Sequence, residues 1–101
     1  MAQEYPNLVN CLGSVLGATG ATVSGSGFVS ARSAKGVYTL TLDQPVNASQ
    51  CSAMATVRAG AVTNSEVVIG HTSDTVKTVL TADAGVAADH NFDFVIFRSP
   101  G

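Results

Sequence analysis

Residues 28–42 read FVSARSAKGVYTLTL, and this stretch decides the fold class. Its second half alternates threonines with three apolar side chains, Tyr38, Leu40 and Leu42. This alternation is typical of a β-strand that buries one face. Gly36 can adopt the positive φ that closes a type I turn. The stretch therefore predicts a β-hairpin with a four-residue loop at 33–36.

Further strands follow at spacings that are typical of an antiparallel sandwich or barrel. Each is a short run of strand-forming residues bounded by turn-forming ones. The expected strands after the hairpin are residues 51–58, 66–71, 75–80 and 92–97. A chain of 101 residues has room for one core. The sequence thus predicts a single all-β domain over 1–101, an antiparallel β-sandwich of the jelly-roll type or a related one.

The last of these runs, residues 92–97, is apolar on both faces apart from Asp93. One face carries Phe92, Phe94 and Ile96, and the other carries Asp93, Val95 and Phe97. A strand with one solvated face needs only one apolar side. We therefore expect either a central strand or a strand covered by another subunit, with one face in the core. The other face should meet a neighbouring subunit or another sheet of the same chain.

The N-terminal segment is open to two interpretations. Five apolar residues fall on one helical face, Leu8, Cys11, Leu12, Val15 and Leu16. Against a helix stand the interior Gly13 and the β character of everything that follows. We favour a strand or an irregular segment over residues 8–16 and keep a short helix as the alternative. Residues 1–22 are expected to be loose or extended, with ordered β structure from Val23 onwards.

The composition favours association with identical copies. Only 12% of residues are charged and 6% are aromatic, whereas about 25% charged is typical of soluble domains. A small domain with few large core residues often gains its missing burial from neighbours. The cations are too scattered to follow a nucleic-acid backbone: Arg32, Lys35, Arg58, Lys77 and Arg98. We expect a homo-oligomer that binds neither nucleic acid nor a membrane, made in the cytoplasm without a signal peptide.

Cys11 and Cys51 are the two cysteines of the chain. Without an export signal, we expect both to be reduced and buried and to act as small hydrophobic residues. A disulfide between them is the alternative, because a loop of this length would be stabilised by roughly 3–4 kcal/mol. Two cysteines so far apart, with no histidine pair, do not make a zinc motif.

The side chains that could carry chemistry do not form a known catalytic motif. Ser24 and Ser26 lie outside any G-x-S-x-G sequence, and His71 and Asp74 flank an expected turn. The glycines match neither a phosphate-binding loop nor a dinucleotide fingerprint. We therefore predict a non-enzymatic protein with no catalytic residues and no cofactor.

The densest polar cluster is Asp89, His90 and Asp93. Carboxylate and imidazole ligands of this kind could hold a divalent ion, especially around a symmetry axis. In an extended chain, however, His90 points away from the two aspartates. We favour a turn that leads into the final strand and predict no metal site.

Residues 25–42, GSGFVSARSAKGVYTLTL, resemble small β domains of bacteriophage virion proteins. In those domains a strand ending in Arg precedes a short turn and a Gly-Val-Tyr-Thr-x-Thr strand, and Arg32 and residues 36–41 match this pattern. Residues 89–97, DHNFDFVIF, are similar to the last strand of those domains. The resemblance covers roughly residues 25–58 and 89–98.

The resemblance implies a trimeric β-sandwich in the virion, used as a capsid decoration (cement) protein or as the head of a tail fibre or spike. Fibre heads usually follow a long repetitive shaft, and about two dozen residues precede the β region here. This departure favours a decoration or head-fibre protein whose partners are other virion proteins such as the major capsid protein. The alternative is a fibre head that binds a receptor or a glycan.

Overall fold

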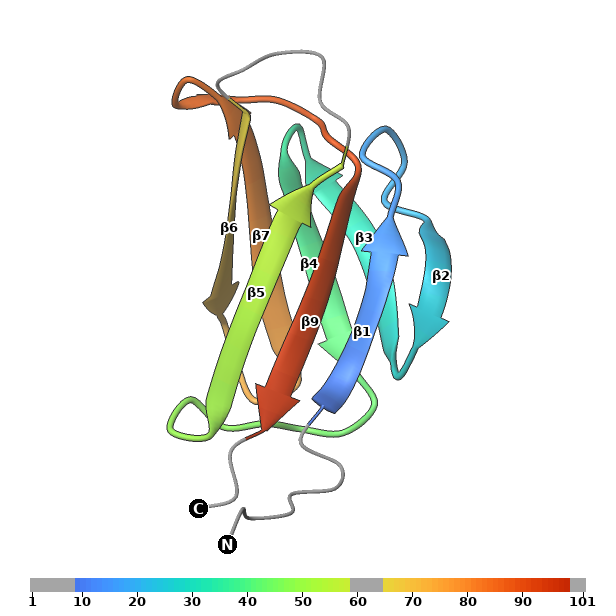
Figure 1. Ribbon diagram of the computed structural model, residues 1–101, viewed down its shortest axis with the longest axis vertical. Coiled ribbons are helices and arrows are strands. Elements are labelled where there is room, and N and C mark those ends of the chain that lie inside the picture. The colour runs from blue at the N-terminus through green and yellow to red at the C-terminus, as the bar shows by residue number, and fades with distance from the viewer. Residues whose placement is uncertain (1–8, 59–64, 99–101) are drawn as a thin grey trace, which may run out of the picture.

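The computed structural model describes residues 9–58 and 65–98. These residues form nine β-strands and no helix, arranged as two antiparallel sheets (Figure 1). The all-β class and the antiparallel arrangement predicted from the alternation are confirmed. Across the same residues, no helix is long and apolar enough to cross a membrane.

Sheet A has the strand order β2-β1-β9-β5. Its strands are β1 (Val9–Val15), β2 (Thr22–Ser26), β5 (Cys51–Val57) and β9 (Phe92–Arg98). β9 pairs with β1 on one side and with β5 on the other. The prediction that the last run forms a central strand is therefore confirmed.

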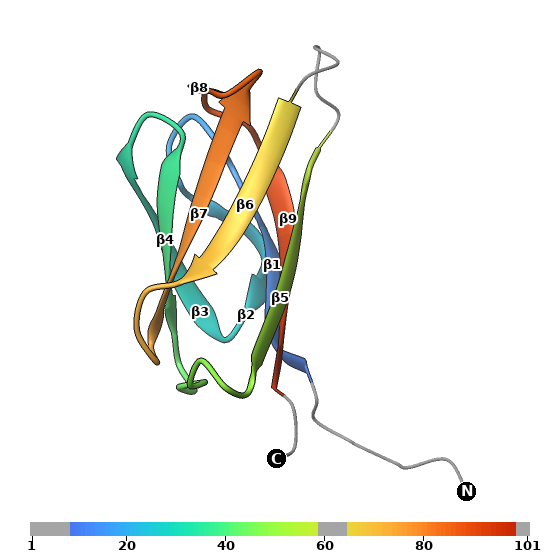
Figure 2. The ribbon, with the colours of Figure 1, turned by 90° about the vertical axis from the view of Figure 1, so that its left-hand side faces the viewer.

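Sheet B has the strand order β3-β4-β7-β6, with a short strand β8 beside the end of β7. Its strands are β3 (Phe28–Ala34), β4 (Val37–Leu42), β6 (Ser65–His71), β7 (Val76–Asp83) and β8 (Val86–Ala87). Figure 2 shows β6 next to β5 on one side of the molecule. β3 and β2 lie on the opposite side, joined through Gly27.

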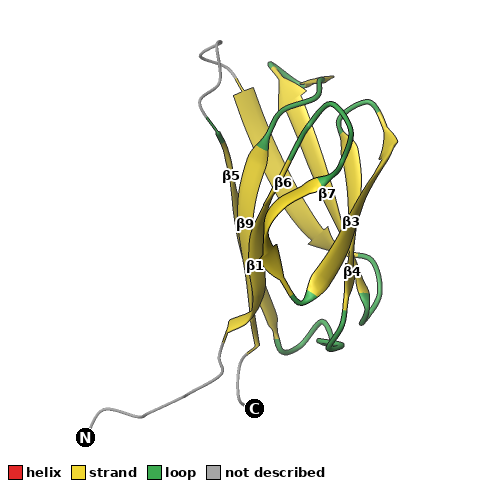
Figure 3. Cartoon of the chain, turned by 90° about the vertical axis from the view of Figure 1, so that its right-hand side faces the viewer, coloured by secondary structure: helices red, strands yellow, loops and turns green. Residues whose placement is uncertain are grey.

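Figure 3 shows the two sheets from the side. The core lies between them. The inward-facing residues of β4 and β9 are the ones that the alternation predicts: Tyr38, Leu40, Leu42, Phe92, Phe94 and Ile96. The ring of Phe28 meets that of Phe94 edge-on, with centroids 4.7 Å apart. Four aromatic rings therefore anchor a core that is otherwise built from small side chains.

The hairpin has a shorter loop than the sequence predicts. Ala34 pairs with Val37, so the loop consists of two residues, Lys35 and Gly36. A register shift between Arg32 and Ala34 absorbs Ser33 into β3 as an irregularity, as a β-bulge does. Gly36 has φ +70°, as the turn prediction requires.

We expect Gly36→Val to destabilise the domain. A Cβ at this position would lie 2.5 Å from the Thr81 carbonyl oxygen, and the left-handed backbone alone costs a β-branched residue roughly 1–3 kcal/mol. Gly85→Val is the matched control, because Gly85 has φ +84° but open space around it. Thermal melts should show a larger loss for Gly36→Val. Equal losses would mean that the contact with β7 contributes nothing.

Within the N-terminal segment that was expected to be loose or extended, residues 9–15 form the extended strand β1. Gly13 and its neighbours two residues away are buried, whereas Leu12 is exposed. β1 is held by ladders to β2 and β9 on both sides. Gly13 is required here, because a Cβ would lie 2.5 Å from the Phe28 ring. The strand interpretation of this segment is confirmed over 9–15, and residues 1–8 lie outside the described part.

Candidate functional site

The outer face of sheet A carries an apolar row that crosses three strands. Leu12, Val95 and Met54 are aligned across β1, β9 and β5 by the strand register. Leu12 is 52% exposed and Met54 59% exposed, with Val95 half-buried between them. This triplet, the sheet A row, is a surface that the described chain leaves uncovered.

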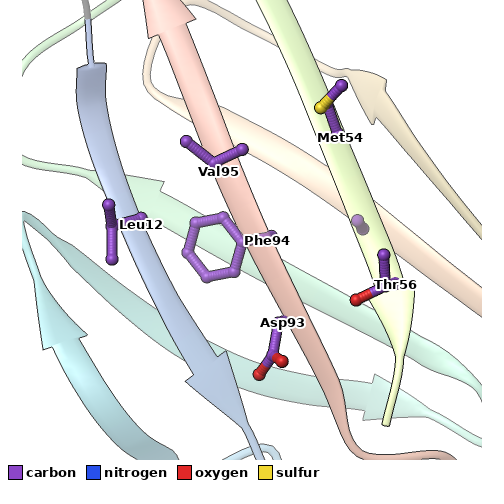
Figure 4. Close-up of a pocket in the computed structure, with 7 residues that line it drawn as sticks. Leu12, Met54, Thr56, Asp93, Phe94 and Val95 are labelled. Atoms are coloured by element: carbon purple, nitrogen blue, oxygen red, sulfur yellow. The ribbon is translucent and has the colours of Figure 1, made fainter.

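A shallow depression of about 280 Å³ lies along the sheet A row (Figure 4). Its lining is Leu12, Met54, Ala55, Thr56, Asp93, Phe94 and Val95. At one end, Asp93 Oδ1 accepts a hydrogen bond of 2.5 Å from Ser14 Oγ and lies 3.4 Å from Arg58 Nε. This exposed ion pair contributes little to stability. An apolar floor with one carboxylate at its end suits contact with a protein side chain.

The outer face of sheet B has a similar row. Val68, Leu80 and Val37 are aligned across β6, β7 and β4. Val68 is 59% exposed and Leu80 47% exposed. The next row along the same strands is polar but uncharged, with Thr78 opposite Thr39. The first three residues form the sheet B row, so each outer face of the molecule has an uncovered apolar row.

Asp89 holds one end of the sandwich together. Its carboxylate accepts hydrogen bonds from Arg32 (2.9 and 3.1 Å), from the Gly36 N–H (2.7 Å) and from the Tyr38 hydroxyl (3.1 Å). The Arg32 guanidinium, followed by the Gly36 N–H, lowers the pKa of Asp89 to about 2. Burial, more than any other cause, raises the pKa of Tyr38. Asp89 therefore acts as a structural link between the hairpin and the chain entering β9.

We expect this link to make stability depend on pH in the acid range. The pKa of Asp89 is lower in the folded state, so its contribution is complete above about pH 4 and is lost as the pH falls towards 2. Asp89→Asn should melt lower than the wild type at pH 6, with the gap closing by pH 2. Thermal melts across this range measure the gap. A gap that stays constant with pH would contradict the proposed role of the charge.

The structure does not bring Asp89, His90 and Asp93 together. Asp89 faces the hairpin, His90 Nε2 lies 2.6 Å from Asp83 Oδ1, and Asp93 faces Ser14. The hydrogen bond from His90 is also the main cause that lowers the pKa of Asp83. In residues 9–58 and 65–98, no group of three or more potential ligands has an arrangement that could hold a metal ion.

The residues considered for a catalytic triad are also separated. Ser24 lies on β2 of sheet A, and His71 ends β6 of sheet B. His71 Nε2 lies 3.8 Å from Asp74 Oδ1, and its Nδ1 lies 2.8 Å from Lys77 Nζ. Because an ammonium group can only donate, His71 Nδ1 accepts this hydrogen bond. The histidine thus serves a buried lysine, and Ser24 and Ser26 lie on the other sheet.

The lysine is the polar feature that the sequence prediction missed. Lys77 is buried, and its Nζ donates to the carbonyl oxygens of Val46 (2.8 Å) and Ser73 (2.7 Å) as well as to His71. These three short bonds match the three N–H groups of an ammonium. The signal was present, because Lys77 and Val79 are two residues apart and so share a strand face.

The two cysteines are free thiols on the inner side of sheet A. Cys11 lies on β1 and Cys51 on β5, with β9 between these strands. Burial raises the pKa of Cys11 to about 11, and a thiol in this state is a poor nucleophile at neutral pH. Both thiols are free, as expected, but Cys51 is half-buried whereas Cys11 is buried.

No protein-family model, curated protein or solved structure matches this chain. A functional proposal therefore rests on the surfaces described above and on the resemblance of residues 25–42 and 89–97.

Proposed function

We propose that this protein is a non-enzymatic structural protein of a bacteriophage particle, used as a capsid decoration or head-fibre protein. The observation that carries the structural role is the pair of apolar rows on the two outer sheet faces. The phage setting comes from the resemblance of the hairpin and the last strand to virion domains.

Apolar rows of this kind are typical of surfaces that another protein covers. Antiparallel sheets usually expose polar residues on the solvent side, and contiguous exposed apolar patches mark interaction sites. Here Leu12, Met54, Val68 and Leu80 occupy that side. A protein that coats or crosslinks a shell uses such faces, because burying them requires no chemistry beyond shape and hydrophobic contact.

Self-association is part of this proposal. The resemblance implies a trimer, and light scattering should then give about three times the chain mass of 10.2 kDa, or about six times that mass if trimers pair through a two-fold contact. A monomer at micromolar concentration would contradict an obligate oligomer.

Binding to purified particles tests the function. Leu80→Lys on the sheet B row and Leu12→Lys on the sheet A row place a charge on an exposed site, so each should change stability by less than about 0.5 kcal/mol. The variant with its lysine on the row that contacts the shell should no longer co-sediment with particles. The variant with its lysine on the other row should still co-sediment. If the wild-type chain neither occurs in particles nor binds them, the proposal is wrong.

The alternative of a glycan- or receptor-binding head needs exposed aromatic rings near polar side chains at one end. In the described residues, Phe28, Tyr38, Phe92 and Phe94 are buried, and Phe97 is half-buried. The described residues therefore provide no exposed aromatic cluster that would favour this alternative.

A further inference from the structure

Apart from the two-residue β8, the described sheets have four edge strands, and β5 is the least protected of them. Natural proteins protect exposed edges with charges, prolines, bulges or short strands. β5 spans seven residues, CSAMATV, and contains neither a charge nor a proline. In the described part of the chain, β5 forms a ladder with β9 alone. Its other edge lies next to β6, with which it shares no ladder, so the backbone groups of this edge have no strand partner in the described chain (Figure 2).

The other three edges each carry a protective feature. β2 has five residues and contains Gly25 with φ +104°. β3 carries Arg32 and a register shift after it. β6 has Glu66 near its start and His71 at its end. The absence of such a feature on β5 indicates an edge that is meant to be paired.

The sequence of β5 identifies a partner, because its chemistry is symmetric about Met54. Ala53 and Ala55 flank the methionine, the hydroxyl residues Ser52 and Thr56 come next, and two small apolar residues, Cys51 and Val57, end the strand. When two identical strands pair antiparallel about a two-fold axis, residues equidistant from the centre lie opposite one another. With Met54 at the centre, every cross-strand pair would join like with like.

We propose that two copies of this chain pair through antiparallel β5 edges, with the two-fold axis at Met54. The pairing joins two copies of sheet A into one continuous sheet by adding a strand to an open edge. It also joins the two sheet A rows, since Met54 ends each row at this edge. The apolar line then runs from Leu12 of one copy to Leu12 of the other.

The inner side of β5 gains burial in the same step. No residue of β5 or β6 is fully buried, although Ala53, Ala55, Val67 and Ile69 pack against the core. Both strands therefore leave the core half-covered on this side. A second β5 strand lying alongside covers part of this side with small side chains that allow close approach.

Paired charges at positions 52 and 56 test the register. Both residues are exposed, so substitution should leave the monomer folded. In Ser52→Lys/Thr56→Lys, each lysine faces a lysine of the partner, and like charges directly opposite are destabilising. In Ser52→Lys/Thr56→Glu, each lysine faces a glutamate. We expect sedimentation to give a dimer dissociation constant at least about tenfold larger than that of the wild type for the first variant. For the second variant the dissociation constant should be near the wild-type value.

A cysteine at the centre gives a second measurement. Opposing Cβ atoms in an antiparallel pair lie about 4.5–5.5 Å apart, which is within reach of a disulfide after small adjustment. Met54→Cys should form a covalent dimer under mild oxidation. The wild-type chain is the control, because Cys51 would lie opposite Val57 and far from the partner's Cys51.

The outcomes are distinct. Any one of three results would overturn the pairing. The wild-type chain could be monomeric at about 100 µM, a concentration at which weak pairing would be detected. The two charge variants could associate equally, or Met54→Cys could give no crosslink. The contact is two-fold and separate from a three-fold one, so a dimer or a hexamer supports it and a trimer insensitive to these variants contradicts it. The virion role is tested separately, since a paired chain that fails to bind particles supports the pairing and refutes that role.

Discussion

Replacing Phe94 with alanine should cost about 3–5 kcal/mol of folding free energy and largely unfold this small domain. Phe94 is buried in the core, where its ring meets Phe28 edge-on and lies 6.4 Å from the ring of Phe92. Few other large side chains are present to fill the space. Circular dichroism during thermal and urea unfolding measures the loss.

Phe97→Ala is the matched control on the same strand. Phe97 points to the outer face of sheet A, opposite Ser52 on β5 and Val9 on β1, and is half-buried. Its loss should weaken association more than it weakens folding of the monomer. If both variants unfold alike and association is unchanged, the outer face of β9 contributes to the monomer alone and is not an assembly surface.

The second large effect is expected for Lys77→Met. Methionine preserves the length of the stem but removes the donor, so the carbonyls of Val46 and Ser73 lose their hydrogen bonds. Val46 is buried, and a buried acceptor without a partner costs about 1–3 kcal/mol, whereas Ser73 is exposed, so water can replace its donor. Relief of the buried ammonium offsets part of this cost, and we expect a net loss of about 1–2 kcal/mol in urea unfolding.

His71→Ala separates the two contributions. It removes one acceptor from Lys77 and leaves the two backbone carbonyls in place. His71→Ala should therefore lose less folding free energy than Lys77→Met. A Lys77→Met variant more stable than the wild type would show that desolvation of the ammonium outweighs its hydrogen bonds.

Much of the fold was predictable because the inner and outer faces of these strands differ in chemistry. In β4, Tyr38, Leu40 and Leu42 alternate with threonines, and one sheet face buries the apolar set. In β9 the same period placed Phe92 and Phe94 in the core. Strand boundaries were less predictable, since β7 continues to Asp83, well past the expected end at residue 80. Pairing with β6 and β8 extends it.

The surfaces proposed as interfaces were only partly predictable. The two-faced β9 indicated that Val95 would lie outside the core, but Leu12 and Met54 join it through register across three strands. Register depends on which strands become neighbours, and β1 and β9 are separated by most of the chain. The symmetry of β5 is visible in the sequence, yet it matters only because β5 is an edge.

The sequence by itself determined the all-β class, the hairpin around Gly36, the two alternating faces of β4 and β9, and the lack of a catalytic motif. These properties follow from local alternation and turn chemistry, which act over a few residues. The tertiary structure alone decided that Asp89 links Arg32 to Gly36 and that the ammonium of Lys77 is enclosed by carbonyls. Each of these depends on groups that are brought together from different strands, and such contacts form only when the sheets assemble.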